Sequence, residues 1–335
     1  MLGVTTPEMV AAVSEAGGLG SLPIGGLSPD RSAELIRKTK ALTSKPFAVN
    51  LFAYAYTYSI DEDEYDAMQA YLKQVCSADG IEAEQKPFSK QQFYNHIDQI
   101  GLLIEEGIKL VSFTFGVLDD ESIETLKRKN TILMGTATSV REAMILDEKE
   151  VDIICAQGSE AGGHRGSFLN MLNPPLIGSI ALIPAIVQAT TKPVIAAGAI
   201  ADGASIHAAF NLGAKAVQIG TPFTTSHESL ATLAWKKALQ SAADTEIILT
   251  NTISGRWARG VRNKLMDKVQ NSGLSIPAYP VQNILTTPIR AAAYKQDNPD
   301  YLVMWRGQSP VPLEQKSSAE IFNKLIRQAE EFAAI

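Results

Sequence analysis

The chain has 335 residues, of which 45% are hydrophobic and 20% charged, and its formal net charge is −6. These proportions are typical of a globular protein with a sizeable core. The acidic balance argues against a nucleic-acid partner, which would require a basic face, and the lack of an 18-residue apolar run argues against a membrane-spanning helix. Because no secretory signal is recognisable and the two cysteines fit reduced thiols, we expect a cytoplasmic protein.

The N-terminal part of the chain alternates helical and strand-like segments. A helix is predicted after Thr6, which can cap it, and Gly17 follows its expected end. Apolar runs at residues 19–24 and 46–52 predict two strands. Between these strands, Ser28 and the proline after it predict the start of a second helix.

The next segment interrupts this pattern. Residues 53–88 are rich in tyrosine and acidic side chains, especially between residues 54 and 71, and we interpret them as an excursion over one face. It either covers the mouth of a site or is a solvated insertion. A helix is then predicted from Ser89, with Gln92 completing a capping box, to about Gly107.

Between residues 109 and 220 the chain repeats a strand and a helix at regular spacing. The strands are continuously apolar, which indicates burial on both faces, as in a parallel sheet covered by helices. The predicted strands are 109–115, 131–137, 151–156, 192–197 and 215–220. The predicted helices are 120–129, 140–147, 178–190 and 203–212.

This rhythm favours a (β/α)₈ barrel or an open doubly wound sheet. Seven strands are predicted up to residue 220, so a complete barrel needs one more strand before the first helix. Either the numbered chain begins after that strand, or the fold departs from a complete barrel.

After residue 222 the rhythm changes. Residues 226–242 predict a helix, and a basic, glycine-containing stretch follows. We interpret 223–299 as a small, mainly helical domain. Residues 300–335 end in another predicted helix, and we expect them to return to the main α/β unit at 1–222.

Polar residues and glycines follow several predicted strands. In barrels of this kind the active site lies at the C-terminal ends of the strands. Asn50 lies near one such end, and Gly198, Gly220 and Thr221 follow the last two strands. These last two loops predict a phosphate site, because glycine lets backbone N–H groups approach phosphate oxygens. The simpler alternative is that they are tight turns.

The most polar of these loops is "AQGSEAGGHRGSF", residues 156–168. Gln157 can both donate and accept hydrogen bonds at the edge of a heterocyclic ring. Gly162 and Gly163 would let a flat ligand lie against the backbone. His164 would then project near that ligand, where an imidazole is easily poised as an acid or a base.

Other polar residues are interpreted as structural. Glu160 and Arg165 are expected to pair with each other or with helices. His96, His207 and His227 lie in helical or polar stretches. No cluster of histidine, cysteine and carboxylate residues has metal-ligand spacing, so no metal site is predicted.

Eight phrases, in order along the chain, resemble the bacterial nitronate monooxygenases, formerly called 2-nitropropane dioxygenases. They are "VNLF", "GTATSVREA", "AQGSEAGGHRGSF", "PVIAAGAIADG", "VQIGT", "SGRWARGVRN", "YPVQNILTTPIRAAA" and "MWRGQSP". The resemblance implies an FMN-binding TIM (β/α)₈ barrel at 1–222 and a small helical, substrate-covering domain at 223–299. It also implies detoxifying oxidation of alkyl nitronates such as propionate 3-nitronate by O2, with no need for reduced nicotinamide.

The resemblance also implies roles for individual residues. His164 matches the active-site histidine, which would orient the nitro oxygens and could act as a base on a neutral nitroalkane. The residues implied to contact FMN are Asn50, Gln157, Gly162, Gly198, Gln218, Ile219, Gly220 and Thr221, with Thr136 and Gln308 as additional contacts.

The chain departs from the family pattern at its start. Members begin with a strand of the type P-I-I-Q-A-P-M, and Met1 falls where the methionine of that motif would be. We therefore expect the native protein to extend upstream by a short segment that supplies the first barrel strand.

Two alternatives remain at this level. An FMN-dependent enoyl-acyl-carrier-protein reductase shares the fold and a related Gly-Gly-His loop, and would need NADH or NADPH. A non-catalytic flavin-binding relative is the other. The sequence indicates neither the physiological nitronate nor the oligomeric state.

Overall fold

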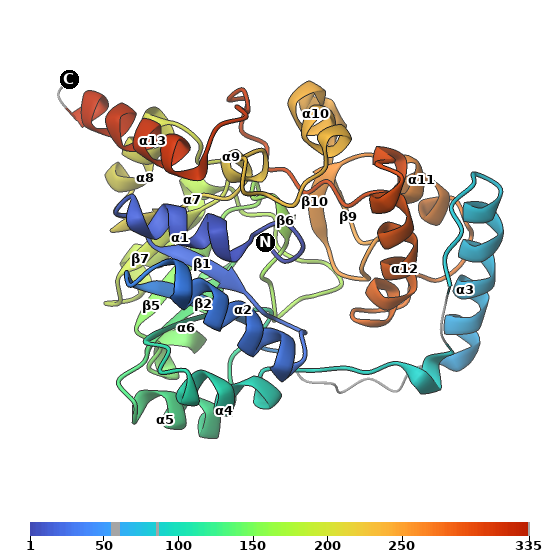
Figure 1. The fold of residues 1–335 in the computed structure, drawn as a ribbon. Helices are drawn as coiled ribbons and strands as arrows, with labels where there is room; N and C mark the ends of the chain where they lie inside the picture. Colours follow the sequence, from blue (N-terminus) through green and yellow to red (C-terminus); the bar gives the residue numbers. More distant parts are fainter. Residues whose placement is uncertain (55–60, 85–86, 334–335) are drawn as a thin grey trace.

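The centre of the molecule is a curled, seven-stranded sheet (Figure 1). The computed structural model describes residues 1–54, 61–84 and 87–333. In spatial order the strands are β1 (Gly20–Pro23), β2 (Phe47–Phe52), β3 (Leu110–Thr114), β4 (Ile132–Ala137), β5 (Ile153–Gln157), β7 (Val194–Ala197) and β8 (Ala216–Gln218). Every pairing is parallel, and β1 and β8 form the two ends of the sheet.

The seven predicted strands are confirmed, with small differences at their ends. Most of their buried apolar side chains belong to one core, in which Val49, Val111, Leu133 and Ile154 are completely buried, and a smaller cluster lies around Met134 and Cys155. Because all these strands run in the same direction, their C-terminal ends emerge at one edge of the sheet. The fold is therefore α/β and resembles a TIM barrel.

Helices cover the outer face of the sheet (Figure 1). They are α1 (Pro7–Glu15), α2 (Pro29–Leu42), α4 (Ile97–Glu105), α5 (Asp120–Lys127), α6 (Val140–Glu148), α7 (Ser179–Ala189) and α8 (Gly203–Asn211). The predicted caps of the first two are confirmed, because Thr6 accepts a hydrogen bond from Met9 N and Ser28 accepts one from Arg31 N. Within the described ranges, no helix combines the length and the apolar character needed to span a bilayer.

The predicted helix start at Ser89 is wrong, because α4 begins at Ile97. Phe88–Lys90 form only a 3-10 turn, η1. The true start is set by two contacts just before the helix. Ile97 N donates to Asn95 Oδ1, and Asn95 N donates to Asp98 Oδ2, each at 2.8 Å. These bonds hold the first turn at a point that the capping-box pattern did not indicate.

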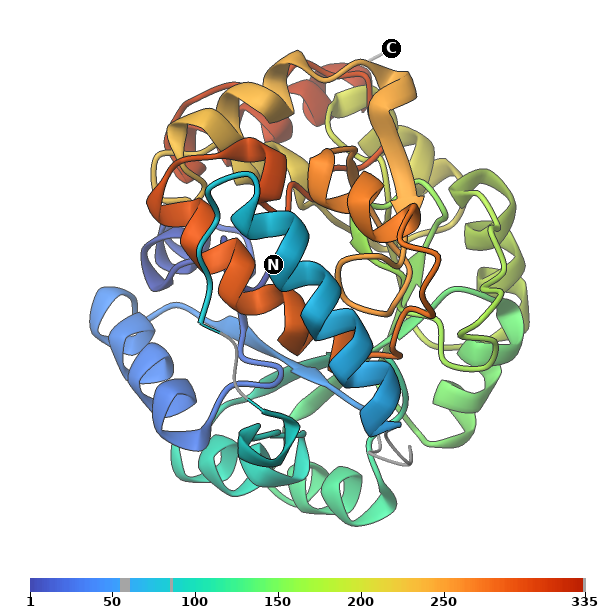
Figure 2. The same ribbon diagram turned by 90° about the vertical axis from the view of Figure 1, so that its right-hand side faces the viewer.

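A second apolar core lies beside the sheet and joins distant parts of the chain. Helix α3 (Glu62–Ser77), from the predicted excursion, packs against α12 (Val281–Lys295) (Figure 2), and buried Met68 and Leu285 belong to this core. The other elements of the region are α10 (Leu233–Ser241), η2 (Asp244–Glu246), β9 (Ile247–Thr250), β10 (Ala258–Val261), α11 (Lys264–Gln270) and η3 (Pro299–Tyr301). The domain boundaries at residues 222 and 299 stay predictions.

The helix predicted over residues 226–242 is also wrong at its start, because α10 begins at Leu233 after its cap Thr232. The residues before it contact the C-terminal tail instead. His227 N donates to Lys316 O at 2.9 Å. A backbone group that bonds a distant segment is not available to extend the helix.

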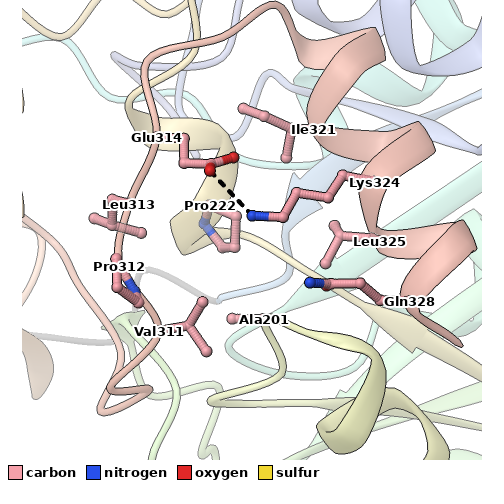
Figure 3. Close-up of a pocket in the computed structure, with 10 residues that line it drawn as sticks. All are labelled: Ala201, Pro222, Val311, Pro312, Leu313, Glu314, Ile321, Lys324, Leu325 and Gln328. Carbon is pink, nitrogen blue, oxygen red and sulfur yellow. Dashed lines mark ion pairs between the residues drawn. The ribbon is translucent and has the colours of Figure 1, made fainter. Parts of the chain in front are cut away.

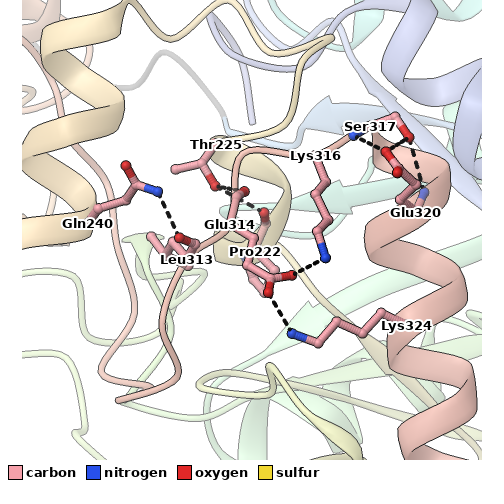
Figure 4. A network of polar contacts seen from close by, with 9 residues as sticks. All are labelled: Pro222, Thr225, Gln240, Leu313, Glu314, Lys316, Ser317, Glu320 and Lys324. Atoms are coloured by element: carbon pink, nitrogen blue, oxygen red, sulfur yellow. Dashed lines mark hydrogen bonds and ion pairs between the residues drawn. The ribbon is translucent and has the colours of Figure 1, made fainter.

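The C-terminal segment runs back to the sheet and ends in α13 (Ser318–Ala333), which contacts α8 and α1 (Figure 1). A cavity separates this helix from Pro222 and from residues 311–314 (Figure 3). Glu314 pairs there with Lys324 at 3.1 Å and with Lys316 at 3.4 Å (Figure 4). The Glu314–Lys324 ion pair joins this segment to its own helix α13, whereas packing on α8 and α1 holds it against the helical layer.

Candidate active site

The loop at residues 156–168 continues directly from β5 and is held by its own side chains. Gln157 Nε2 donates to His164 O at 3.0 Å, and Gly166 N donates to Gln157 Oε1 at 2.8 Å. The side-chain amide of Gln157 therefore bonds the backbone of the loop at two points, His164 and Gly166. The strand end fixes the amide, and the amide fixes the backbone that carries His164.

Charged groups anchor the rest of this loop, and one of them, Arg165, is almost completely buried. The Arg165 guanidinium donates to Gly158 O at 2.5 Å and to Gln157 O at 3.1 Å. Glu160 accepts from both the backbone N–H and the hydroxyl of Ser179 at the start of α7. Glu160 therefore pairs with a helix, which was one of the two predicted alternatives, and Arg165 pairs with the loop backbone.

The helical region supplies the other wall of the site. His164 lies in the short strand β6 (Gly163–His164), which pairs antiparallel with β10 so that His164 faces Ala258. The His164 Nε2 atom lies 2.7 Å from the buried Ser254 Oγ. The Arg256 Nε donates to Arg165 O at 3.3 Å. His164 thus lies between its own loop, residues 156–168, and the hairpin formed by β9 and β10.

Aromatic rings surround the imidazole. The ring centres of Trp305, Phe115 and Tyr279 lie 5.4, 5.6 and 6.2 Å from that of His164. The Arg256 guanidinium carbon lies 4.1 Å from the centre of the Phe115 ring. Phe115, which follows β3, has a φ of +78°, a strained conformation that is most often kept at functional sites.

The electrostatics of this wall favour a neutral histidine. Burial, together with the positive charges of Arg256 and Arg290, lowers the pKa of His164 from 6.5 to about 3. Burial also lowers the pKa of Arg290 to about 10. At neutral pH the two arginines carry the positive charge of the site, whereas the imidazole is uncharged.

The turns after β7 and β8 differ from this crowded loop. The register pairs Ala197 with Gln218, so the two turns leave the sheet side by side. Gly198 and Ala199 have φ values of +121° and +54°. Among the described residues, none accepts a hydrogen bond from the backbone N–H groups of Gly198, Ala199 or Gly220. A side chain placed on Gly220 would also meet open space.

These turns fit a bound phosphate group. Unbonded N–H groups in a left-handed turn form a concave surface that attracts anions. The turns follow the last two strands of a barrel-like sheet, where such folds commonly bind phosphate. The residues predicted to bind phosphate thus lie beside backbone N–H groups that donate to no described residue.

Gly162 is required for a different reason. A Cβ atom there would lie 2.5 Å from Gly307 N and 2.6 Å from Arg306 C, so only glycine fits without moving the backbone. The same segment is tied down on both sides, because Gly307 N donates to Thr221 Oγ1 and Gln308 N donates to Glu160 O, each at 3.0 Å. Residues from the C-terminal segment therefore cross between the β5 loop and the end of β8.

The remaining predicted cofactor residues lie along the same edge of the sheet. Asn50 Nδ2 donates to Ser112 Oγ at 2.9 Å, and Gln218 Oε1 accepts from Cys155 Sγ at 3.4 Å. Thr136 lies at the end of β4, where it would collide with any side chain on Gly166. The others are Ile219, which packs on the core, Thr221, which begins α9 (Thr221–Thr224), and Gln308, which is exposed.

The other residues considered from sequence lie away from this chemistry. His96 Nε2 lies 2.8 Å from Asp119 Oδ2 in the helical layer. Both cysteines are buried and unpaired, and burial raises the pKa of Cys76 to about 11 and that of Cys155 to about 12. Such thiols are poor nucleophiles. Across the described ranges, no group of three potential ligands is arranged to hold a metal ion.

Sequence reasoning missed most of the wall that faces His164. Ser254 and Arg256 belong to "SGRWARGVRN", and Tyr279 and Arg290 belong to "YPVQNILTTPIRAAA"; both phrases support the family resemblance, but none of these four residues is among the predicted site residues. Their basic and aromatic content was the available signal. Phe115 had none, because nothing in an apolar strand marks the residue that adopts a left-handed conformation.

An α/β barrel-like enzyme with its site at the carboxyl edge of a parallel sheet is the class that this geometry defines. The family model of nitronate monooxygenase matches residues 1–328. The chain is 42% identical over 334 residues to a probable nitronate monooxygenase from Staphylococcus saprophyticus, covering 99% of this chain and 93% of that relative. A protein of the same description from Staphylococcus haemolyticus is 40% identical, covering 98% and 92%. The chain therefore belongs to the nitronate monooxygenase family and is an oxidoreductase.

Solved structures agree with this assignment. The nitroalkane oxidase from Streptomyces ansochromogenes has a TM-score of 0.89 and 30% identity, covering 99% of this chain and 94% of that one. FabK from Thermotoga maritima has a TM-score of 0.76 and 27% identity, covering 100% and 92%. The fold is thus shared with both, and the nitroalkane oxidase is the more similar of the two.

Proposed function

We propose that this chain uses FMN and molecular oxygen to oxidise alkyl nitronates of the propionate 3-nitronate type, and so detoxifies them in the cytoplasm. The observation that carries the proposal is the family match over residues 1–328. The likeness to a nitroalkane oxidase supports it, because a nitronate is the conjugate base of a nitroalkane.

The edge of the sheet fits FMN. The donors at Gly198 and the open space at Gly220 suit a phosphate group. Gln157 and Gly162 would shape the wall beside the cofactor through the loop that they hold in place. When bound, FMN would supply the redox chemistry that links the nitronate to oxygen. The residues that would hold it are Asn50, Thr136, Gln157, Gly162, Gly198, Gln218, Ile219, Gly220, Thr221 and Gln308.

The charge of the site suits an anionic substrate. Arg256 and Arg290 attract the nitronate, and the neutral imidazole of His164 contacts it without adding charge. An imidazole with a pKa of about 3 is a weak base at pH 7. The site therefore favours a preformed nitronate over a neutral nitroalkane, whose carbon must first lose a proton.

Oxygen consumption tests the proposal directly. The purified protein is mixed with propionate 3-nitronate in air, with and without NADH. We expect rapid oxygen uptake that NADH does not increase, and release of FMN on denaturation, identified by mass. The variant to compare is His164→Asn, which keeps a polar side chain; loss of the imidazole that positions the nitronate should lower kcat/KM by about 100-fold.

The FabK likeness gives the second candidate, an enoyl-acyl-carrier-protein reductase. Anaerobic mixing separates the two functions. If NADH reduces the bound flavin quickly while the nitronate leaves it oxidised, the monooxygenase proposal fails. A protein that is colourless and does not take up added FMN would instead favour the non-catalytic relative.

A further inference from the structure

Ser254 lies in the turn between β9 and β10 and is almost completely buried. Its hydroxyl oxygen is 2.7 Å from His164 Nε2, which is a short hydrogen bond. It also lies 3.2 Å from Arg256 O and 3.4 Å from Arg256 N. No role for this serine followed from the sequence.

The hydroxyl has one proton, and its neighbours determine where that proton goes. A backbone carbonyl can only accept a hydrogen bond, so Ser254 must donate to Arg256 O. The serine oxygen then accepts from Arg256 N–H and from the imidazole. All these groups are satisfied at once only if His164 carries its proton on Nε2. With the proton on Nδ1, the buried carbonyl of Arg256 would lose the serine as a donor.

We propose that Ser254 is a positioning residue for His164, which holds the imidazole in the Nε2–H tautomer and leaves Nδ1 as the free acceptor in the site. In the described part of the chain, no residue forms a hydrogen bond with Nδ1. Orientation of a histidine by a partner on its other ring nitrogen is a general device, and it determines which nitrogen is available to a ligand.

The serine is itself held in place by helix α12. Gln282 Nε2 donates to Thr252 O at 2.7 Å, and Thr286 Oγ1 donates to Ile253 O at 2.6 Å. Both donors are completely buried. Two successive carbonyls just before Ser254 are thus fixed by one helix, so the hydroxyl meets the imidazole without further rearrangement.

This tautomer has a consequence for the substrate, which rests on the proposed function. A lone pair on Nδ1 repels the partly negative oxygens of a nitronate. The oxygens are thereby directed to Arg256 and Arg290, and the carbon end of the nitronate lies nearer to His164. Repulsion from one group and attraction to another together determine one binding orientation.

Nitrogen NMR of the protein, labelled at its four histidines, tests the tautomer without any substrate. His164→Asn assigns the signals, because one imidazole disappears. In the wild-type protein as purified we expect a protonated Nε2 and an unprotonated Nδ1 at pH 7. In Ser254→Ala the two shifts should move towards each other as the tautomers exchange. A wild-type His164 protonated on Nδ1, or shifts that Ser254→Ala leaves unchanged, would overturn the proposal.

Kinetics test the positioning role in the working enzyme. Ser254→Ala should lower kcat/KM for propionate 3-nitronate about tenfold, mainly through kcat, and Ser254→Thr should restore most of it because it keeps the hydroxyl. The matched control is Thr252→Val, which removes a buried hydroxyl from the same turn. That hydroxyl bonds the Thr250 hydroxyl and does not bond His164. An equal loss in Thr252→Val would show that the turn merely loosened, and would contradict the proposal. A protein with the expected tautomer but no nitronate turnover would refute the proposed function alone.

Discussion

The loop after β5 and the turns after β7 and β8 contain similar residues and use them differently. In the first, Gly162 makes room for the backbone of Arg306 and Gly307, and the Gln157 amide holds its own loop. In the second, the Gly198 N–H group donates to none of the described residues, and Gly220 borders open space among them. A glycine in these loops can therefore be required for packing or can leave room for a ligand, and its neighbours show which requirement applies.

The largest expected effect tests the packed side of this comparison. Gly162→Ala should destabilise the protein by about 2–3 kcal/mol, because its methyl group would overlap backbone atoms that cannot rotate away. Urea unfolding of the variant and the wild type measures this difference. Equal unfolding midpoints would mean that the C-terminal segment shifts freely, and that Gly162 is not required for packing.

The next effect concerns the buried histidine on the same loop. Because the pKa of His164 falls from 6.5 to about 3 on folding, the unfolded chain binds more protons between these values. The folded state therefore loses stability as the pH falls through this window, by up to about 1.4 kcal/mol per pH unit from this group. Between pH 7 and pH 4.5, the free energy of unfolding of the wild type should fall by about 2 kcal/mol more than that of His164→Gln. Urea unfolding at each pH measures this difference. If the free energies of unfolding of the two proteins change equally with pH, the lowered pKa of His164 is contradicted.

A smaller effect is expected from the cationic wall opposite the loop. The Arg290 guanidinium is held by Asn283 and Thr287, its buried Nε has no described partner, and no described carboxylate forms an ion pair with it. Arg290→Gln should raise the KM for an anionic nitronate about tenfold, which corresponds to about 1.4 kcal/mol, with less change in kcat. Arg290→Lys, which keeps the charge, is the matched control. If the wild type, Arg290→Gln and Arg290→Lys have the same KM, Arg290 does not attract the substrate.

The smallest effect on stability is expected in the turns after β7 and β8, where Gly220 borders open space. Gly220→Ala should change the free energy of unfolding by less than about 0.5 kcal/mol, because the added methyl group meets no atom. Under the proposed function it should still weaken FMN binding several-fold, as measured by flavin fluorescence in a titration of the apoprotein. If Gly220→Ala instead destabilises the protein as much as Gly162→Ala does, the contrast between the two edges disappears.

The strands of the sheet were predictable because each is a short apolar run in a regular strand–helix repeat, and several are bounded by glycine or proline, as residues 192–197 illustrate. The starts of α4 and α10 were not, because local capping patterns compete with other contacts. At α4 the Asn95 and Asp98 side chains set the first turn, and before α10 the backbone of His227 bonds the distant Lys316. Local sequence carries no information about the second kind of contact.

The sequence by itself determined the parallel sheet, the polar edge where its strands end, and His164 as the central side chain of that edge. These follow from local patterns, since apolar periodicity and glycine placement are properties of short segments. Only the tertiary structure decided that Ser254, Arg256 and Arg290 lie near this histidine and that Gly162 packs against Arg306 and Gly307. Those relations join segments about 90 residues or more apart in the chain, and they exist only once hydrophobic burial has brought the helical region against the sheet.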